Sequence, residues 1–385
     1  MRPTRSGVRG RWPRALVALA YAIGTLVFFE GVARLTLSLP FFVRCVGLRE
    51  EPAWRLRWER RPRGRSSIYY GFDVHHPVRG WAVRPDVRNQ VMFGDRVLST
   101  NSEGVRGVRE YARTRAPGTQ RVLVLGDSFT FGDEVSDDET YAHFLEELLP
   151  GVEVVNLGVH GYGHDQMLLY LREVGARYAP DLVLLGFVAD DMERSLLGFR
   201  DFAKPRFALV DGGLELHGTP VPSPEEVSRT AWRRSRFLDL FAMLHHAWLW
   251  RSGRATRRMQ ALTGAILDEI QREAEGLGAR VAFAYLPIHG EIVDSRPSLL
   301  DGERFLLRYC RQRGVACWSV RPLFRSRLQA GVRFKVFDHW GPREHCTAAE
   351  AIRAELLQRS LVRADAAARG CFESTPLRPD STPGS

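Results

Sequence analysis

Residues 121–132 read RVLVLGDSFTFG, and this stretch decides the fold class of the chain. The apolar run Val122 to Leu125 is typical of a buried strand, and it stops abruptly at Gly126-Asp127-Ser128. A serine at the carboxyl end of a buried strand lies where an open α/β sheet binds its ligands. As a three-residue string, the same pattern also fits a strand-to-helix turn with an N-cap serine. The stretch predicts a strand, a tight turn and a helix, with Ser128 at the edge of a sheet.

Strand-like and helix-like segments alternate after this stretch. We expect strands at 121–125, 152–156, 181–187, 279–285 and 315–320, and helices at 138–149, 164–177, 256–276, 301–313 and 344–361. An alternation of this kind implies a parallel sheet whose two faces are covered by helices. Two short strands, 91–93 and 97–100, are expected upstream on either side of a Gly-Asp turn.

Residues 196–250 interrupt the alternation as an insertion. Within it, 207–210 and 214–217 flank Asp211-Gly212-Gly213, which predicts a hairpin. The insertion follows the third strand, so it begins at the sheet edge where Ser128 is expected. A lid and a passive surface hairpin both fit this position. A predicted helix over 237–250 would either pack the hairpin down or face lipid.

The N-terminus has the pattern of a membrane anchor. Residues 1–14 contain five arginines, and an uncharged run of fifteen residues follows from Ala15 to Phe29. A spanning helix needs about 17–25 residues, and the apolar pattern resumes beyond Glu30, which can pair with Arg34 one turn later. A cleaved signal peptide is the competing interpretation, although no small-x-small cleavage site precedes Pro40. The positive-inside rule places residues 1–14 in the cytoplasm and the body of the protein outside it.

The composition argues against nucleic-acid binding. The chain of 385 residues has a formal net charge of +10, and its basic residues are nearly all arginines. Apart from residues 55–65 and the N-terminal tail, these arginines are scattered and form no basic stripe. The positive charge therefore fits affinity for an anionic surface better than nucleic-acid binding. We expect a cytoplasmic tail and anchor at 1–43, a juxtamembrane connector and small β-rich extension at 44–120, an α/β domain at 121–362 and a disordered tail at 363–385.

The five cysteines form no C-x-x-C pattern, so metal binding through cysteine is poorly supported. Outside the cytosol a disulfide is allowed. Cys310 ends a predicted helix and Cys317 lies in the next predicted strand. The sequence leaves two possibilities: a disulfide between these two residues, or two buried free thiols.

Five sequence blocks carry a resemblance to a known superfamily. In chain order they are Thr100-Asn101-Ser102-Glu103-Gly104-Val105-Arg106-Gly107, Gly126-Asp127-Ser128, Asn156 to Gly163, Asp181 to Asp191, and Asp338-His339-Trp340. Over roughly residues 75–360 the chain resembles the SGNH, or GDSL, hydrolase superfamily. The first block is similar to that of a membrane-anchored, extracytoplasmic branch. The resemblance implies a flavodoxin-like three-layer α/β/α sandwich with a parallel sheet.

The resemblance also implies a serine-hydrolase site. A serine hydroxyl is a poor nucleophile until a base takes its proton, and that base is a histidine held by a carboxylate. By position in the blocks, Ser128 would be the nucleophile, His339 the base and Asp338 its carboxylate. Superfamily members usually space that pair as D-x-x-H or D-x-H, whereas here the two residues are adjacent. Either the loop is rearranged, or a backbone carbonyl orients His339, or the pair of Asp338 and His339 is weakened. His345 is the reserve base, for which a structural or helix-capping role is favoured.

Two further residues would complete the oxyanion hole beside the Ser128 N–H. By position, Gly161 would supply a backbone N–H at close approach to the substrate. Superfamily members usually place an asparagine side chain where this chain has Asp190, which precedes Asp191. An ionised Asp190 would repel a developing oxyanion, whereas a protonated one could donate to it. Alternatively Asp190 pairs with an arginine such as Arg194, and the site is specialised or inactive.

The predicted function is an SGNH/GDSL-type serine esterase that acts on O-acyl bonds. A glycan O-acyltransferase is an alternative, because Asp338-His339-Trp340 is similar to the D-x-H-W of periplasmic alginate-acetylation proteins. A catalytically weakened glycan- or lipid-binding protein is another. The expected partners are an acylated small molecule, glycan or lipid and the membrane, but no nucleic acid. No cofactor or metal is expected, because His160, His164 and Asp165 lack a fourth ligand.

Overall fold

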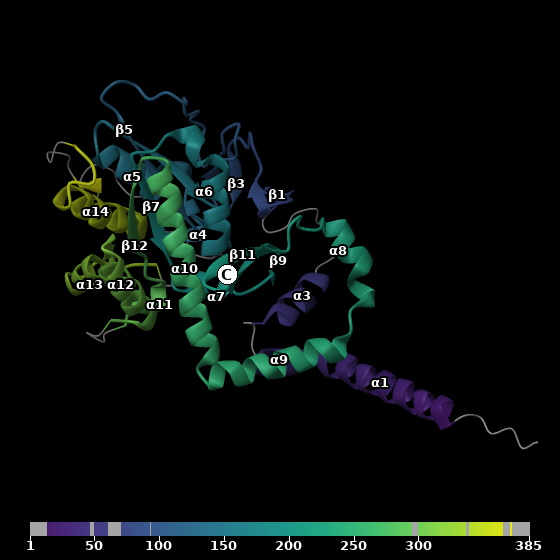
Figure 1. Ribbon diagram of the computed structural model, residues 1–385. Coiled ribbons are helices and arrows are strands. Elements are labelled where there is room, and N and C mark those ends of the chain that lie inside the picture. Colours follow the sequence, from purple (N-terminus) through teal and green to yellow (C-terminus); the bar gives the residue numbers. More distant parts are fainter. Residues whose placement is uncertain are drawn as a thin grey trace, which may run out of the picture.

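The computed structural model of the protein describes residues 14–46, 50–60, 71–92, 94–294, 299–335, 339–364 and 370–371. At its centre is a five-stranded parallel sheet (Figure 1). In spatial order the strands are β13 (Ala316–Ser319), β12 (Arg280–Tyr285), β7 (Leu182–Phe187), β5 (Gln120–Gly126) and β6 (Val152–Gly158). Numbered along the chain and read from β6, this order is 2-1-3-4-5, that of flavodoxin-like folds. The prediction of the sheet is confirmed, and each strand begins and ends within two residues of its expected position.

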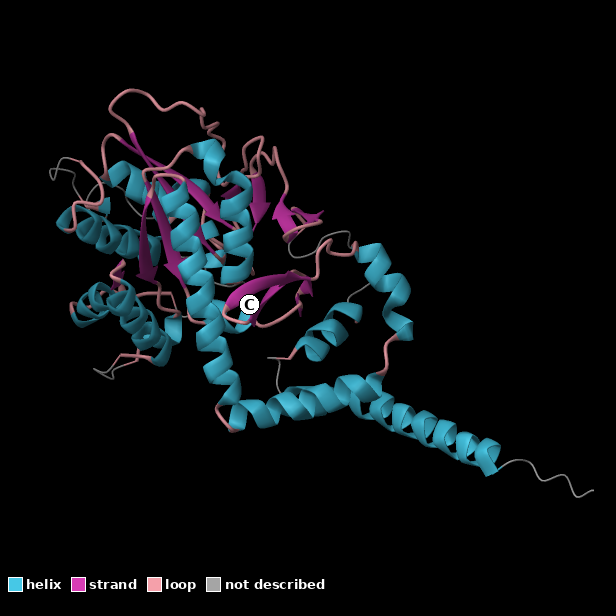
Figure 2. Cartoon of the chain, viewed as in Figure 1, coloured by secondary structure: helices cyan, strands magenta, loops and turns pink. Residues whose placement is uncertain are grey.

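Helices cover both faces of the sheet (Figure 2), as the alternating sequence predicts. Successive strand residues point to opposite faces, so Leu123 and Leu125 pack with one set of helices and Val122 and Val124 with the other. The first set is α6 (His164–Tyr178), α10 (Arg254–Gly276) and α12 (Asp301–Arg313). The second set is α5 (Tyr141–Leu148), α13 (Arg321–Gln329) and α14 (Pro342–Gln358). Strands buried on both faces are continuous apolar runs, which is why they could be read from the sequence.

Short antiparallel pairs lie outside the central sheet. They are β1 (Asp73–His76) with β2 (Gly80–Val83), β3 (Gln90–Met92) with β4 (Arg96–Leu98), β8 (Phe199–Arg200) with β9 (Phe202–Ala203), and β10 (Arg206–Val210) with β11 (Gly213–His217). The β3–β4 pair and the β10–β11 hairpin confirm two predictions made from turn residues. Phe93, expected in the first of these strands, lies outside the described residues.

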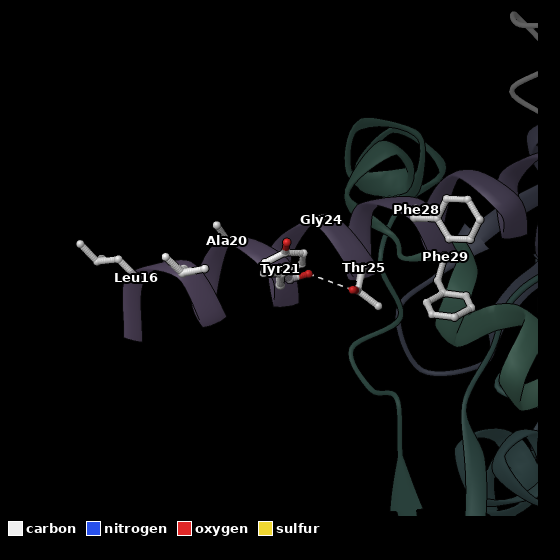
Figure 3. Close-up of a pocket in the computed structure, with 8 residues that line it drawn as sticks. Leu16, Ala20, Tyr21, Gly24, Thr25, Phe28 and Phe29 are labelled. Carbon is white, nitrogen blue, oxygen red and sulfur yellow. Dashed lines mark hydrogen bonds between the residues drawn. The ribbon is translucent and has the colours of Figure 1, made fainter. Parts of the chain in front are cut away.

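The N-terminal helix α1 (Arg14–Ser38) is long and apolar enough to cross a membrane, by length and composition. It projects from the body of the protein (Figure 1), and Figure 3 shows Leu16, Tyr21 and Phe28 along its surface. Exposed apolar side chains on a helix of this length are typical of a lipid-facing segment. The helix continues through the apolar pattern expected beyond Glu30 and ends at Ser38.

The last turns of α1 are bound to the rest of the protein. Leu37 packs with residues of α2 (Pro40–Val46), α3 (Glu51–Glu59) and α9 (Arg236–Arg251). The predicted ion pair between Glu30 and Arg34 is present, with 2.8 Å between Oε1 and Nη2. Glu30 also accepts hydrogen bonds from the N–H groups of Arg236 and Phe237, each at 3.0 Å. The candidate anchor is thus fixed to the N-terminal end of α9.

The insertion connects β7 to α10 through α7 (Asp190–Arg194), the two hairpins, α8 (Pro224–Thr230) and α9. Phe207 of β10 is buried in the core cluster that contains α6 and α10, so the hairpin rests against the domain. Lys204, fully buried, forms an ion pair with Asp165 at the start of α6 and holds the insertion there. Along α9 the side chains of Leu238, Phe241, Leu244 and Trp248 are exposed.

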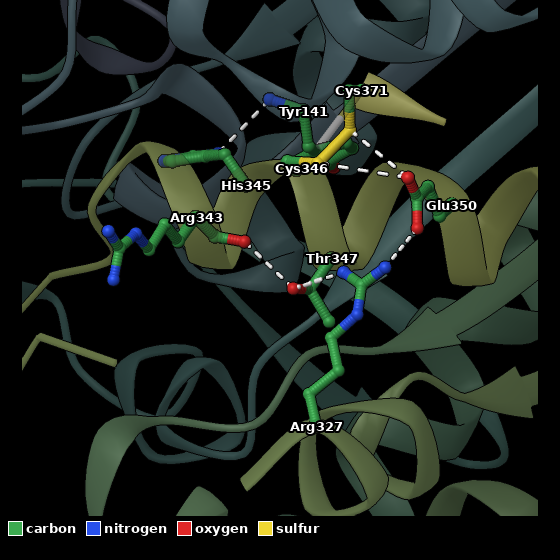
Figure 4. The surroundings of a disulfide bond; sticks show 8 residues. All are labelled: Tyr141, Arg327, Arg343, His345, Cys346, Thr347, Glu350 and Cys371. Carbon is green, nitrogen blue, oxygen red and sulfur yellow. Dashed lines mark hydrogen bonds and ion pairs between the residues drawn. A yellow bond between two sulfur atoms is a disulfide. The ribbon is translucent and has the colours of Figure 1, made fainter. Parts of the chain in front are cut away.

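The disulfide joins Cys346 of α14 to Cys371 (Figure 4). Cys310 and Cys317, for which a bond was left open on the sequence alone, are free thiols in the structure. The true pair was missed because Cys371 lies in a polar tail that carries no periodic pattern. The prediction of disorder for 363–385 falls mostly outside the described residues, but Cys371 itself is buried against the domain.

Candidate active site

The nucleophile candidate lies at the carboxyl end of the central strand β5. Ser128 is the first residue of α4 (Ser128–Phe131), and its side chain is buried. The N-cap is Asp127, whose Oδ1 accepts a hydrogen bond from the Phe129 N–H at 3.0 Å, so Ser128 is not the cap of this helix. Gly126 is required by packing, because a Cβ there would lie 1.9 Å from Oγ1 of Thr130. The turn thus presents the serine hydroxyl at the edge of the sheet.

His339 faces this serine from the last segment of the domain. Its Nε2 lies 2.9 Å from Ser128 Oγ, a hydrogen-bonding distance. The imidazole packs beside the Phe129 ring, with 5.3 Å between ring centroids. The next residue, Trp340, is buried and donates from Nε1 to the Pro287 carbonyl at 3.1 Å. This anchor fixes the backbone of the segment and therefore the position of the histidine.

Both imidazole nitrogens also lie near acidic side chains from the loop after α4. His339 Nδ1 lies 3.6 Å from Oε1 of Glu134, and Nε2 lies 3.8 Å from Oδ2 of Asp133. Burial by itself lowers the pKa of His339, but Glu134, Asp133 and Asp127 outweigh it, so this pKa is raised above its usual value. Asp338, the carboxylate expected from the resemblance, lies outside the described residues.

A buried chain of charged groups continues behind Asp133. His160 Nδ1 lies 3.9 Å from Oδ1 of Asp133, and its Nε2 lies 2.5 Å from Oδ1 of Asp73 on β1. Burial raises the pKa of Asp133, and its carboxylate has no hydrogen-bond partner in the described part of the chain. Asp73 comes from the β-rich extension, so the extension contributes directly to the surroundings of the site.

The two oxyanion candidates follow the strands on either side of β5. Gly161, in the loop after β6, has a φ of +73°, a conformation that favours glycine. Asp190, after β7, is the first residue of α7 and is exposed. Its neighbour Asp191 is fully buried, and burial together with Asp127 raises the pKa of Asp191 well above its usual value. Arg194 donates from Nη1 to Asp191 at 2.6 Å and to Asp127 at 2.7 Å.

The remaining histidines near the site have structural surroundings. His345 is buried on α14, and its Nδ1 accepts a hydrogen bond from the Tyr141 N–H at 3.0 Å (Figure 4). Burial lowers the pKa of His345 to about 3, so it is neutral and acts as an acceptor. His164 is stacked on Phe187, with 4.6 Å between ring centroids. Asp165, considered with it as a metal ligand, is instead paired with Lys204.

The Thr100–Gly107 block stabilises, through Arg106, the segment that follows the nucleophile. Arg106 is buried and donates to the carbonyls of Phe131, Gly132 and Val135 at 3.2, 3.1 and 2.7 Å. Its Nε also binds Oδ1 of Asp137 at 2.6 Å. Since those carbonyls lie on the segment from Phe131 to Val135, which includes Glu134 and directly follows the start of α4 at Ser128, the block supports the site from outside.

Three acidic residues of the site were not predicted from the sequence: Asp73, Asp133 and Glu134. Asp133 and Glu134 lie in an acidic run just before the helix expected at 138–149. A signal was present, since both directly follow the Gly132 that ends the nucleophile block. Their relation to His339 depends on a contact across about two hundred residues of sequence, which no local pattern reveals.

Comparisons with known proteins give similarity in structure only. No family model matches the chain, and no curated protein matches it. A member of the lipolytic protein G-D-S-L family from Veillonella parvula DSM 2008 is 11% identical with a TM-score of 0.37, over 62% of this chain and 97% of that one.

Two other solved structures match at a similar level. LAE5, an alpha/beta hydrolase enzyme from the metagenome of Lake Arreo, Spain, is 14% identical with a TM-score of 0.39, over 63% of this chain and 97% of that one. Axe2, an acetylxylan esterase from Geobacillus stearothermophilus, is 14% identical with a TM-score of 0.36, over 62% and 95%. The strand order of this chain, taken by itself, is that of the flavodoxin-like α/β fold.

Proposed function

We propose that this protein is an SGNH/GDSL-type serine esterase that cleaves O-acyl bonds. The observation that carries the proposal is the 2.9 Å contact between Ser128 Oγ and His339 Nε2 at the carboxyl end of β5. A nucleophile within hydrogen-bonding distance of a base is the arrangement that activates a serine hydroxyl. The blocks that resemble the superfamily bring these two residues from opposite ends of the domain to one edge of the sheet.

The chemistry follows from this pair. His339 Nε2 takes the Ser128 proton while Oγ attacks the ester carbonyl carbon, and the carbonyl oxygen becomes an oxyanion. The N–H groups of Ser128 and Gly161 are the proposed donors to that oxyanion. When the C–O bond to the alcohol breaks, His339 returns the proton to the departing alcohol and leaves an acyl-enzyme. His339 then deprotonates water, which attacks the acyl carbon; as the bond from that carbon to Ser128 Oγ breaks, His339 returns the proton to Oγ, and a carboxylic acid and free Ser128 result.

The substrate class is an acylated small molecule, glycan or lipid. A direct test is hydrolysis of p-nitrophenyl acetate by the full-length protein in detergent micelles. Ser128→Ala and His339→Ala should each reduce kcat/KM by at least about 10³. His345→Gln keeps an acceptor for the Tyr141 N–H, so it should retain most activity. Hydrolysis that survives both Ser128→Ala and His339→Ala would contradict the proposal.

We further propose that α1 anchors the protein in a membrane with the domain outside the cytoplasm. Support comes from the length and composition of α1 and from the arginines that precede it. A C-terminal alkaline phosphatase fusion should be active, and the mature N-terminus should retain the apolar run. An inactive fusion would contradict the orientation, and a mature N-terminus beyond Leu39 would contradict the anchor.

A further inference from the structure

Glu134 has a backbone conformation that a glutamate rarely adopts. Its φ is +69°, in the left-handed region where a side chain is strained and glycine is preferred. Residues held in such conformations persist where their surroundings fix them, and they gather at functional sites. An outlier two residues after Gly132, in the loop that follows the nucleophile helix, therefore calls for a functional explanation.

The Glu134 carboxylate lies between two basic groups. It forms an ion pair with Nζ of Lys335, and its Oε1 lies 3.6 Å from Nδ1 of His339. The contact with His339 and the charge of Lys335 hold the pKa of Glu134 at about 2, so it is ionised at neutral pH. The 3.6 Å separation is an ion-pair distance, and a shift of about 0.5 Å would make it a hydrogen bond. Contacts of catalytic groups are often this long before substrate binds.

A purely structural role for Glu134 explains less. It could serve to hold the segment that carries Lys335, but that segment is already fixed by Glu344 of α14. The buried Glu344 carboxylate accepts hydrogen bonds from the N–H groups of Lys335 and Gly341, the latter at 3.0 Å. Glu134 is therefore not needed to fix the position of His339 between these two anchors. It is needed to supply the negative charge beside Nδ1.

We propose that Glu134 is the positioning carboxylate of His339, held in place by Lys335, so that the third member of the catalytic group comes from the nucleophile loop. This inference rests on the proposed function. In a serine-hydrolase triad, the histidine uses Nε2 toward the serine and Nδ1 toward a carboxylate. His339 has this arrangement, with Ser128 on Nε2 and Glu134 on Nδ1. Glu134 fixes the tautomer with a proton on Nδ1 and stabilises the imidazolium that forms during catalysis.

The charged groups around His339 set the direction of the pH effect. Asp127 precedes α4, Asp133 follows it beside Glu134, Lys335 precedes the histidine, and His345 lies on α14. Removing the negative charge of Glu134 while leaving the others in place should lower the pKa of His339. Since the base works in its neutral form, the acidic limb of the kcat/KM profile should then move to lower pH.

The test compares Glu134→Gln with a matched control. Glu147→Gln removes a carboxylate that contacts His143 Nε2 at 3.4 Å on the surface, so it alters another Glu–His pair away from the site. Glu134→Gln should lower kcat by about 10²–10⁴ with little change in KM and shift the acidic limb by about one pH unit. Glu147→Gln should match the wild type in all three quantities.

Two more variants separate positioning from strain and from the competing carboxylate. Glu134→Gly suits a φ of +69°, so its melting temperature should hold or rise while its activity falls like that of Glu134→Gln. Asp338→Asn should cost less activity than Glu134→Gln. The proposal is overturned if Glu134→Gln keeps wild-type kcat and pH profile, or if Asp338→Asn shows the loss expected of Glu134→Gln.

A titration of His339 by NMR keeps this test independent of turnover. In a Ser128→Ala background, which needs no substrate, Glu134→Gln should lower the His339 pKa by about one unit. An unchanged His339 pKa would overturn the role of Glu134 even if the enzyme were active. If the wild type hydrolyses no ester but this shift is found, the proposed function fails and the pairing of Glu134 with His339 stands.

Discussion

Arg194 binds Asp127 directly beside the nucleophile, with 2.7 Å between Nη1 and Oδ2, and both side chains are largely buried. The same guanidinium nitrogen lies 2.6 Å from Oδ1 of Asp191. One arginine therefore binds two buried acidic side chains, one from the turn after β5 and one from α7. This contact connects the residue that precedes Ser128 to the helix that begins with Asp190.

Replacing Arg194 by glutamine should strongly destabilise the protein. The substitution removes the cation that the buried Asp127 and Asp191 side chains share, and breaking a buried pair in this way costs about 3–5 kcal/mol. Urea denaturation measures the change. Arg304→Gln is the control, since its pair with Asp301 is on the surface and should contribute less than about 1 kcal/mol. A loss for Arg194→Gln no larger than that of the control would contradict this account of the pair.

Asp190→Asn should raise esterase turnover. If Asp190 lies at the oxyanion position, the substitution removes a negative charge and supplies a neutral N–H donor, and one such donor is worth about 10²–10³ in rate. Because Asp190 is exposed, stability should change by less than about 0.5 kcal/mol. The measurement is kcat with p-nitrophenyl acetate. A fall in kcat would instead mean that the carboxylate itself assists catalysis.

His164 should make the protein less stable in acid. Burial, with a contribution from Arg194, lowers its pKa to about 3 in the folded state, whereas an unfolded histidine titrates near 6.5. Between these two values the unfolded state binds a proton that the folded state does not, so stability falls as pH falls. His164→Phe removes this proton uptake and keeps a ring against Phe187.

The free energy of unfolding of His164→Phe, measured by urea between pH 4 and 6, should depend on pH less steeply by about 1.4 kcal/mol per pH unit. Equal slopes for wild type and His164→Phe would show that His164 is charged in the folded state.

Loss of the Cys346–Cys371 disulfide should lower the free energy of unfolding by about 3 kcal/mol. The bond closes a loop with a sequence separation of 25 residues, and cross-links of this size restrict the unfolded chain by that amount. A Cys346→Ala/Cys371→Ala variant should be insensitive to reductant, while reductant should destabilise the wild type. If the reductant effect persisted in this variant and vanished in Cys310→Ala, the pairing would be wrong.

The sheet and its helices could be predicted because their signals are local. The middle residues of strands such as β5 and β7 are buried on both faces and form apolar runs, and helices such as α12 show the 3.6-residue period directly. The hairpin of β10 and β11 was visible in its turn residues. The nucleophile block was visible because its turn requires Gly126 and a buried strand before it.

The surroundings of His339 could not be predicted, because they depend on contacts between distant segments. Glu134 meets the histidine only when the segment before α14 folds onto the loop after β5. Asp73 reaches the site through His160, and it belongs to a small hairpin outside the α/β alternation. The disulfide was missed for the same reason, since Cys371 reaches Cys346 from a tail without periodicity.

The most direct test of the central claim is whether Ser128 reacts covalently as a nucleophile. The full-length protein is treated with a fluorophosphonate probe, and the adduct is mapped by mass spectrometry. We predict one adduct on Ser128 that is lost in Ser128→Ala and strongly slowed in His339→Ala, because the 2.9 Å contact makes His339 the base. A folded wild-type protein with no adduct at Ser128 at any pH between 6 and 9 would contradict the assignment.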